Sequence, residues 1–257
     1  MLNLKRTDSW ITVPKANPQA NLRLFCFPYA GGSSTIFRPW LDKLPAIIEI
    51  CPIELPGRGS KIKLAPLNRL EPIVEGLALQ IQSYLDKPFA FFGHSMGGIL
   101  SFELARLLSK KYEIKPVNLF ISACGAPQIP DSEPPIHALP ESDLIAELRD
   151  YNFTPSEVLE NQELMQLFIP ILRADFAVSE TYTYHHAPPL ECPISVFGGL
   201  RDHKVTIEEL KAWQEQTNSY FLLNMLPGDH FFINYSHLLL LEQISEILKH
   251  RLENEWH

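Results

Sequence analysis

The chain has 257 residues, 46% of them hydrophobic and 20% charged, and this composition excludes a disordered protein. Its formal net charge of −8 disfavours nucleic-acid binding, which needs a basic surface. The N-terminus lacks the apolar core of a signal peptide, and no segment reaches 18 apolar residues, so we expect a cytoplasmic protein without a membrane span. The widely spaced cysteines are expected to be buried free thiols; they are Cys26, Cys51, Cys124 and Cys192.

Short apolar runs alternate along the chain with segments of helical period. Strands are predicted, in chain order, at Leu22–Phe27, Ile48–Ile53, Phe89–Phe92, Val117–Ser122, Ile194–Phe197 and Tyr220–Leu226. Helices are predicted between them at Glu71–Leu85, Met96–Ser109, Thr206–Gln216 and His237–Leu252. This alternation predicts an α/β fold with a mostly parallel sheet and helices on both faces.

One segment, at about residues 125–189, interrupts this alternation. It holds no convincing strand, and helical pieces are expected at Pro140–Tyr151, Pro155–Glu160 and Gln162–Glu180. Nine of the chain's 22 prolines fall between Cys124 and Pro189, which predicts short helices hinged at prolines. We interpret the segment as a helical lid over the carboxyl edge of the sheet, inserted into a single domain that spans residues 1–257.

A candidate nucleophile follows the third predicted strand. Residues 93–97 read Gly-His-Ser-Met-Gly, which matches the G-x-S-x-G pattern of a sharp turn from a strand into a helix. Small residues at both ends of such a turn let the backbone approach closely, while Ser95 is exposed at the helix N-terminus. Backbone N–H groups at that position favour a developing oxyanion.

A serine nucleophile needs a base and an acid that orients the base. Asp202 follows the predicted strand at Ile194–Phe197, and His230 follows the one at Tyr220–Leu226. The order Ser, Asp, His and the placement at strand ends agree with a triad of Ser95, Asp202 and His230. Alternatives are weaker; they are Asp229 and Asp175 for the acid, His203 and His94 for the base, and His185 with His186 as a metal pair.

Two backbone donors are needed for an oxyanion hole. One is the amide of Met96, directly after the nucleophile. The loop after the first strand reads Phe-Pro-Tyr-Ala-Gly-Gly-Ser-Ser from Phe27, and its glycines allow a close approach to the site. Ala30 is the candidate for the second donor, with its neighbour Tyr29 as the alternative. Tyr29 and Phe231 are also candidate substrate-binding residues, and no metal site is expected.

Six motifs together resemble the type II thioesterases, which are stand-alone α/β-hydrolases of nonribosomal peptide and polyketide synthesis. They are FPYAGGSS from Phe27, ELPGRG from Glu54, GHSMGG from Gly93, LRADF from Leu172, GGLRD from Gly198 and GDHFF from Gly228. The resemblance covers about residues 10–250. It departs from the family at Leu148–Pro155, where a usual glycine is absent, and at Asp229, which replaces a usual glycine.

This resemblance implies a serine thioesterase that removes aberrant acyl groups from the phosphopantetheine arm of carrier proteins. It implies Ser95, Asp202 and His230 as the triad, Ala30 and Met96 as oxyanion donors, a helical lid and no cofactor. Carrier proteins are usually acidic, so we expect a local basic patch at Arg58 and Lys61, near Lys63, to dock them. A monomer is expected.

Two other functions are considered beside a carrier-protein thioesterase. One is a serine esterase or lipase acting on small oxygen esters, or a related thioesterase of fatty-acid or coenzyme A chemistry. The other is a non-catalytic α/β-hydrolase-like protein that binds a ligand or partner. The presence of all three residue types of the triad at the predicted strand ends argues against the binding protein.

Overall fold

The computed structural model describes residues 9–130, 133–150 and 160–254. In this part of the chain six parallel strands form one sheet in the order β2-β1-β3-β4-β5-β6. The strands are β1 (Leu22–Phe27), β2 (Ile48–Pro52), β3 (Phe89–His94), β4 (Leu119–Ser122), β5 (Ile194–Gly199) and β6 (Phe221–Leu226). The predicted α/β fold is therefore confirmed, and all six predicted strands are present with small shifts at their ends.

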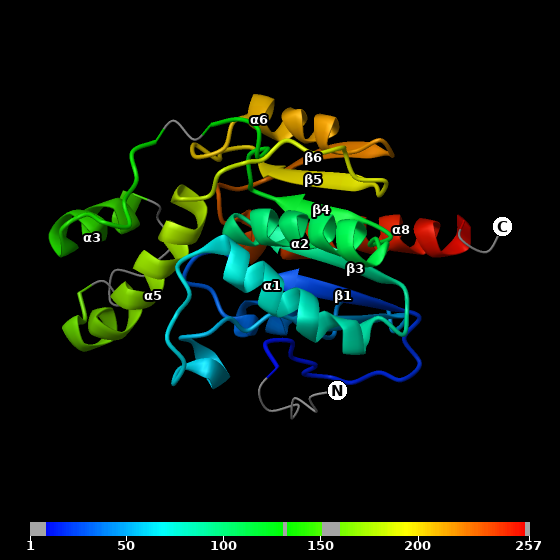
Figure 1. Ribbon diagram of the computed structural model, residues 1–257, viewed down its shortest axis with the longest axis horizontal. Helices are drawn as coiled ribbons and strands as arrows, with labels where there is room; N and C mark the ends of the chain where they lie inside the picture. The colour runs from blue at the N-terminus through cyan, green and yellow to red at the C-terminus, as the bar shows by residue number, and fades with distance from the viewer. Residues whose placement is uncertain (1–8, 131–132, 151–159, 255–257) are drawn as a thin grey trace.

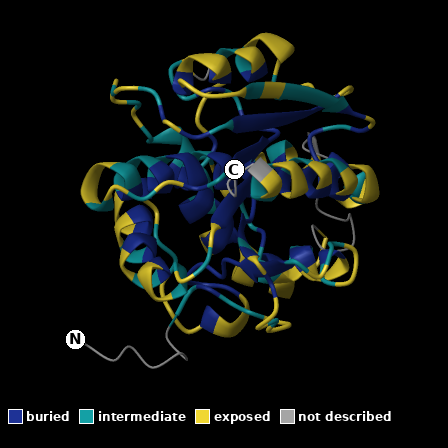
Figure 2. Cartoon of the chain, turned by 90° about the vertical axis from the view of Figure 1, so that its right-hand side faces the viewer, coloured by how far each residue is buried: buried dark blue, intermediate teal, exposed yellow. Residues whose placement is uncertain are grey.

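Helices cover both faces of this sheet (Figure 1). One face is packed by α1 (Leu70–Ile81), α2 (Met96–Tyr112) and α6 (Ile207–Lys211), and the other by α7 (Phe232–Tyr235) and α8 (His237–Asn254). Strands β1 to β5 are almost wholly buried, the edge strand β6 is only partly buried, and the helices expose their outer faces (Figure 2). Thr206 and Glu209 form a capping box at the start of α6.

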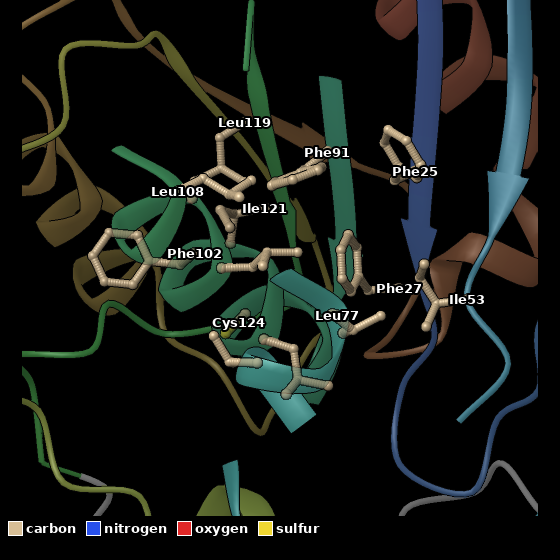
Figure 3. Close-up of a cluster of buried hydrophobic side chains, with 14 of the residues drawn as sticks. Phe25, Phe27, Ile53, Leu77, Phe91, Phe102, Leu108, Leu119, Ile121 and Cys124 are labelled. Carbon is tan, nitrogen blue, oxygen red and sulfur yellow. The ribbon is translucent and has the colours of Figure 1, made fainter. Parts of the chain in front are cut away.

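The larger core lies between the sheet and helices α1 and α2 (Figure 3). Alternate residues of each strand face it, so Phe25 and Phe27 of β1 meet Phe91 of β3 on the same side of the sheet. The ring of Phe91 is fully buried, and its centroid lies 5.9 Å and 5.3 Å from those of Phe25 and Phe27. This aromatic cluster holds β3 against β1, and β3 leads directly to Ser95.

The segment between β4 and β5 contains α3 (Glu141–Asp150) and α5 (Gln162–Glu180), which lie beyond one end of the sheet (Figure 1). These helices share a small hydrophobic cluster of their own, formed by Ile136, Leu144, Leu148, Met165, Ile169 and Leu172. The predicted helical segment therefore lies between β4 and β5 in the structure. Its action as a lid stays a prediction. The helix expected at Pro155–Glu160 and the glycine-free stretch from Tyr151 lie largely outside the described residues.

The helix predicted at Gln162–Glu180 is confirmed as α5 with the same ends, so the expected division of the insertion at prolines does not occur at Pro170. Helix α5 runs through this residue for 19 residues. Proline removes one backbone donor from a helix, but packing of the adjacent residues Ile169, Ile171 and Leu172 outweighs that loss.

All four cysteines are buried and unpaired, as predicted. Burial raises the pKa of the Cys124 thiol to about 12, so this thiol is unreactive at neutral pH. None of the described helices is both long enough and apolar enough to cross a membrane.

Truncation of the aromatic cluster is expected to destabilise the whole fold. Phe91→Ala should lower the free energy of unfolding by about 3–5 kcal/mol, because it leaves a cavity between β1 and β3. Leu79→Ala, at a residue of α1 that is 63% exposed, should change it by less than about 0.5 kcal/mol. Urea unfolding followed by circular dichroism measures both, and equal losses would contradict this account of the core.

Candidate active site

Ser95 lies in a sharp turn between β3 and α2, at the carboxyl edge of the sheet. Its backbone has φ 53° and ψ −121°, a region that non-glycine residues rarely adopt. A Cβ on Gly93 would lie 2.0 Å from the Gly97 carbonyl oxygen, and a Cβ on Gly97 would lie 2.3 Å from that of Phe27. Both positions therefore require glycine, and the tight turn brings the end of β1 close to the N-terminus of α2.

The structure brings Ser95, His230 and Asp202 together from the ends of β3, β6 and β5. The Ser95 Oγ lies 3.1 Å from His230 Nε2, and His230 Nδ1 lies 3.0 Å from Asp202 Oδ2. Because a carboxylate only accepts hydrogen bonds, Nδ1 carries the proton and Nε2 is free to accept one from Ser95. This is the geometry of a nucleophile, a base and an orienting acid.

The carboxylate of Asp202 is held ionised by its neighbours. Burial would raise its pKa, but the hydrogen bond and charge of His230 and the N–H groups of Lys204 and Val205 lower it below its ordinary value. Those N–H groups donate to Oδ1 at 2.8 Å and 3.2 Å, while Oδ2 accepts from His230. The side chain is 1% exposed, so its orientation is fixed.

Two backbone amides are available beside the nucleophile. Within the described part of the chain, neither Met96 N–H nor Ala30 N–H donates to another backbone carbonyl. Met96 begins α2, where the first amides have no partner inside the helix. Ala30 lies in a turn closed by Gly32 N–H donating to the Tyr29 carbonyl at 2.9 Å, and Gly31 has φ +76°, as in a type II turn. Both amides suit the predicted oxyanion hole.

His94 is fully buried behind the site. Its Nε2 lies 2.9 Å from the backbone carbonyl of His230 and therefore donates to it, and its Nδ1 accepts from Ser122 Oγ at 2.9 Å. Burial lowers the pKa of His94 to about 3, and the nearby His230 ring acts in the same direction. His94 thus anchors the loop that carries His230 and is no rival base.

The other rival residues do not join the triad. Asp229 Oδ1 accepts from the Phe231 amide at 2.9 Å, and it makes no described hydrogen bond to the His230 ring. Asp175 is completely buried in α5 and pairs with Arg58. His185 and His186 are exposed, and among the described residues no cluster of three or more His, Cys, Asp or Glu side chains is placed to hold a metal.

The predicted docking patch at Arg58 and Lys61 is wrong. Arg58 is 4% exposed because its guanidinium turns inward to Asp175, and Lys61 is 8% exposed within the short helical turn at Gly59–Lys61. Neither side chain offers a charged surface to a partner. Lys63 is exposed, but it does not form the expected patch alone.

Tyr29 and Phe231, the candidate substrate-binding residues, lie largely in the interior, and their contact with substrate stays a prediction. The two residues are 2% and 8% exposed and lie in the core on the α8 side of the sheet, where their rings pack edge-to-face with centroids 5.2 Å apart. Tyr29 also contacts the His94 ring at 5.7 Å, and Phe231 contacts the His230 ring at 5.1 Å. These aromatic residues support His94 and His230 and present little surface to a substrate.

Comparison with known proteins agrees with this geometry. A family model described as a thioesterase domain matches residues 22–252. The gramicidin S biosynthesis protein GrsT of Aneurinibacillus migulanus is 45% identical to this chain over 249 residues, which is 97% of each protein. The chain belongs to the thioesterase family.

Solved structures of biosynthetic thioesterases are also similar to this chain. The thioesterase RedJ from the prodiginine pathway of Streptomyces coelicolor is 34% identical, with a TM-score of 0.85 over 90% of this chain and 87% of RedJ. YbtT, a type II thioesterase from the yersiniabactin nonribosomal peptide synthetase/polyketide synthase pathway, is 32% identical, with a TM-score of 0.85 over 95% of this chain and 99% of YbtT. The resemblance to type II thioesterases is thus confirmed, and this thioesterase is a thioester hydrolase.

Because His94 is buried in its neutral form, we expect the stability of this thioesterase to fall at acidic pH. An unfolded histidine has an ordinary pKa of 6.5, so between pH 6.5 and about 3 the unfolded chain binds a proton that the folded chain excludes. The free energy of unfolding should therefore fall by about 1.4 kcal/mol per pH unit as the pH drops through that window.

Urea titrations at pH 7 and pH 5 measure this effect. The wild type should lose about 2 kcal/mol more than His94→Asn over that interval. The exposed control His186→Asn should behave as the wild type does. An identical pH dependence for His94→Asn and the wild type would show that His94 is not kept neutral.

Proposed function

We propose that this thioesterase hydrolyses acyl thioesters on the phosphopantetheine arm of carrier proteins in nonribosomal peptide or polyketide synthesis, and so removes aberrant acyl groups. The proposal rests above all on the Ser95–His230–Asp202 arrangement inside a thioesterase domain that spans residues 22–252. The similarity to GrsT and YbtT supports the pathway class. We further propose a cytoplasmic monomer that uses no metal or organic cofactor.

The first step is acyl transfer to the enzyme. His230 Nε2 takes the proton of Ser95 as Oγ attacks the thioester carbonyl carbon, and Asp202 stabilises the imidazolium that forms. The amides of Ala30 and Met96 bind the oxyanion, and each such donor typically lowers the barrier by about 3 kcal/mol. The carbon–sulfur bond breaks, and the pantetheine thiolate takes the proton from His230.

The second step releases the acid. His230 accepts a proton from water, the resulting hydroxide attacks the acyl-Ser95 ester, and the same two amides bind the second oxyanion. Collapse of this intermediate returns the proton to Ser95 Oγ. Since His230 alternates between base and acid, its neutral form with the proton on Nδ1 is needed at the start of each step.

Replacement of the nucleophile tests the proposal. Ser95→Ala should lower kcat for an acylated carrier protein by at least about 1,000-fold, because no acyl-enzyme can form. Release of the acid is followed by chromatography, and circular dichroism checks folding. Hydrolysis by Ser95→Ala at the wild-type rate would remove the assignment.

Substrate choice separates the proposal from its alternatives. The wild type should show a higher kcat/KM for an acyl group on a holo carrier protein than for the same group on coenzyme A or on a simple aryl ester. A preference for the aryl ester would instead favour an esterase. A preference for the coenzyme A thioester would favour fatty-acid or coenzyme A chemistry.

A further inference from the structure

A buried ion pair joins α5 to the loop that carries Ala30. The guanidinium of Arg58 donates to both carboxylate oxygens of Asp175, at 2.5 Å from Nη1 and 2.7 Å from Nη2. The side chains are 5% and 1% exposed. Arg58 follows β2 and Asp175 lies in α5, so the pair connects segments 117 residues apart.

Both partners also hold the backbone of the type II turn at residues 29–32. Asp175 Oδ2 accepts from the Gly31 amide at 2.7 Å, and Arg58 Nη1 donates to the Gly32 carbonyl at 3.1 Å. The Gly31 amide belongs to the central peptide of the turn, directly after Ala30. Its orientation therefore sets the direction of the Ala30 backbone.

The surrounding contacts leave this turn little freedom. A Cβ on Gly31 would lie 2.7 Å from Leu172 Cδ2, so the Leu172 side chain packs directly against Gly31. Leu172 lies three residues before Asp175, on the same face of α5. On the far side of the turn, Glu54 accepts from the amide and hydroxyl of Ser34 at 3.2 Å and 2.7 Å. The loop is thus fixed at both ends by buried charged groups.

Stability alone is a poor explanation for this ion pair. Burial of two charges has a desolvation cost that often cancels their attraction, and apolar pairs of similar volume are frequently as stable. Here Arg58 Nε is buried and has no hydrogen-bond partner among the described residues, which adds to that cost. The pair nonetheless directs two hydrogen bonds onto one short turn, and that turn carries the proposed oxyanion donor.

We infer that Arg58 and Asp175 are positioning residues that hold the Ala30 amide in the oxyanion hole and tie its geometry to helix α5. This inference rests on the proposed acyl-enzyme mechanism. It assigns the ELPGRG and LRADF motifs a role in transition-state stabilisation, in place of carrier docking.

The test replaces both partners at once, so that no unpaired charge remains. Arg58→Met with Asp175→Leu should keep the fold but lower kcat by about 10- to 100-fold, with KM changed less than about 3-fold, because the donor is misplaced and not lost. Affinity for an acyl trifluoromethyl ketone, whose adduct with Ser95 carries the oxyanion, should fall by the same factor as kcat. A merely structural role would not link these two quantities.

The control is a partly buried ion pair at the opposite end of the strands. Arg23 Nε donates to Glu49 Oε2 at 2.7 Å between β1 and β2. Arg23→Met with Glu49→Leu should leave kcat and ketone affinity unchanged. If the Arg58/Asp175 double variant fails to fold, Asp175→Glu takes its place, since it keeps the charges but moves the carboxylate by one methylene.

Unchanged kcat and ketone affinity in a folded variant would overturn the inference, as would a rise in KM alone. These outcomes are distinct from failure of the proposed function. If the proposed function is wrong, Ser95→Ala retains hydrolysis. If only the positioning role is wrong, Ser95→Ala is inactive and the Arg58/Asp175 double variant has the wild-type kcat.

Discussion

The turn at Ser95 is the constraint on which the rest of the site depends. Its backbone has a positive φ, and it is stable only because Gly93 and Gly97 allow contacts that any side chain would block. Strand β3 is held in the centre of the sheet by Phe91 and its aromatic neighbours, so the core supplies the rigidity that the strained turn needs. The same contact of Gly97 with the Phe27 carbonyl places the end of β1 beside the nucleophile.

A parallel sheet then brings the other groups to this edge. Asp202 and His230 follow β5 and β6, and they reach Ser95 because all strands end on the same side. Behind them, His94 bonds the His230 carbonyl, and Tyr29 and Phe231 fill the remaining space. On the other side of Ser95, the turn with Ala30 is held by Arg58 and Asp175. His230 and the turn with Ala30 are therefore each held by buried contacts, and Tyr29 takes part in both sets.

Much of this arrangement follows from the sequence. Strand and helix periodicity predicts all six strands in order, and the rule that functional residues follow strand ends selects Ser95, Asp202 and His230. The strands are present and the three side chains meet because these predictions rest on local patterns and on the direction of parallel strands. Element ends shift by a few residues, as at β5, where hydrogen bonding extends the strand to Gly199.

The errors share a physical cause. The sequence shows Arg58 and Lys61 as charges in a loop, and only the tertiary fold reveals that Asp175, 117 residues later, neutralises Arg58 in the interior. A signal was nonetheless present, since Asp175 lies on the face of α5 that also buries Leu172 and Val178. An acid on an apolar helical face indicates a buried cationic partner. Aromatic rings such as Tyr29 give no comparable signal, because periodicity does not separate packing from substrate contact.

Capture of the acyl group on the enzyme tests the acyl-Ser95 mechanism without relying on a variant. The protein is mixed with a carrier protein that bears a radiolabelled acyl thioester, quenched in acid within milliseconds and mapped by peptide mass spectrometry. If the acyl group passes through the enzyme as proposed, the label lies on Ser95, and no acid is released after a serine-directed phosphonate has blocked this residue. Label on another side chain, or undiminished acid release by the blocked enzyme, would contradict this mechanism.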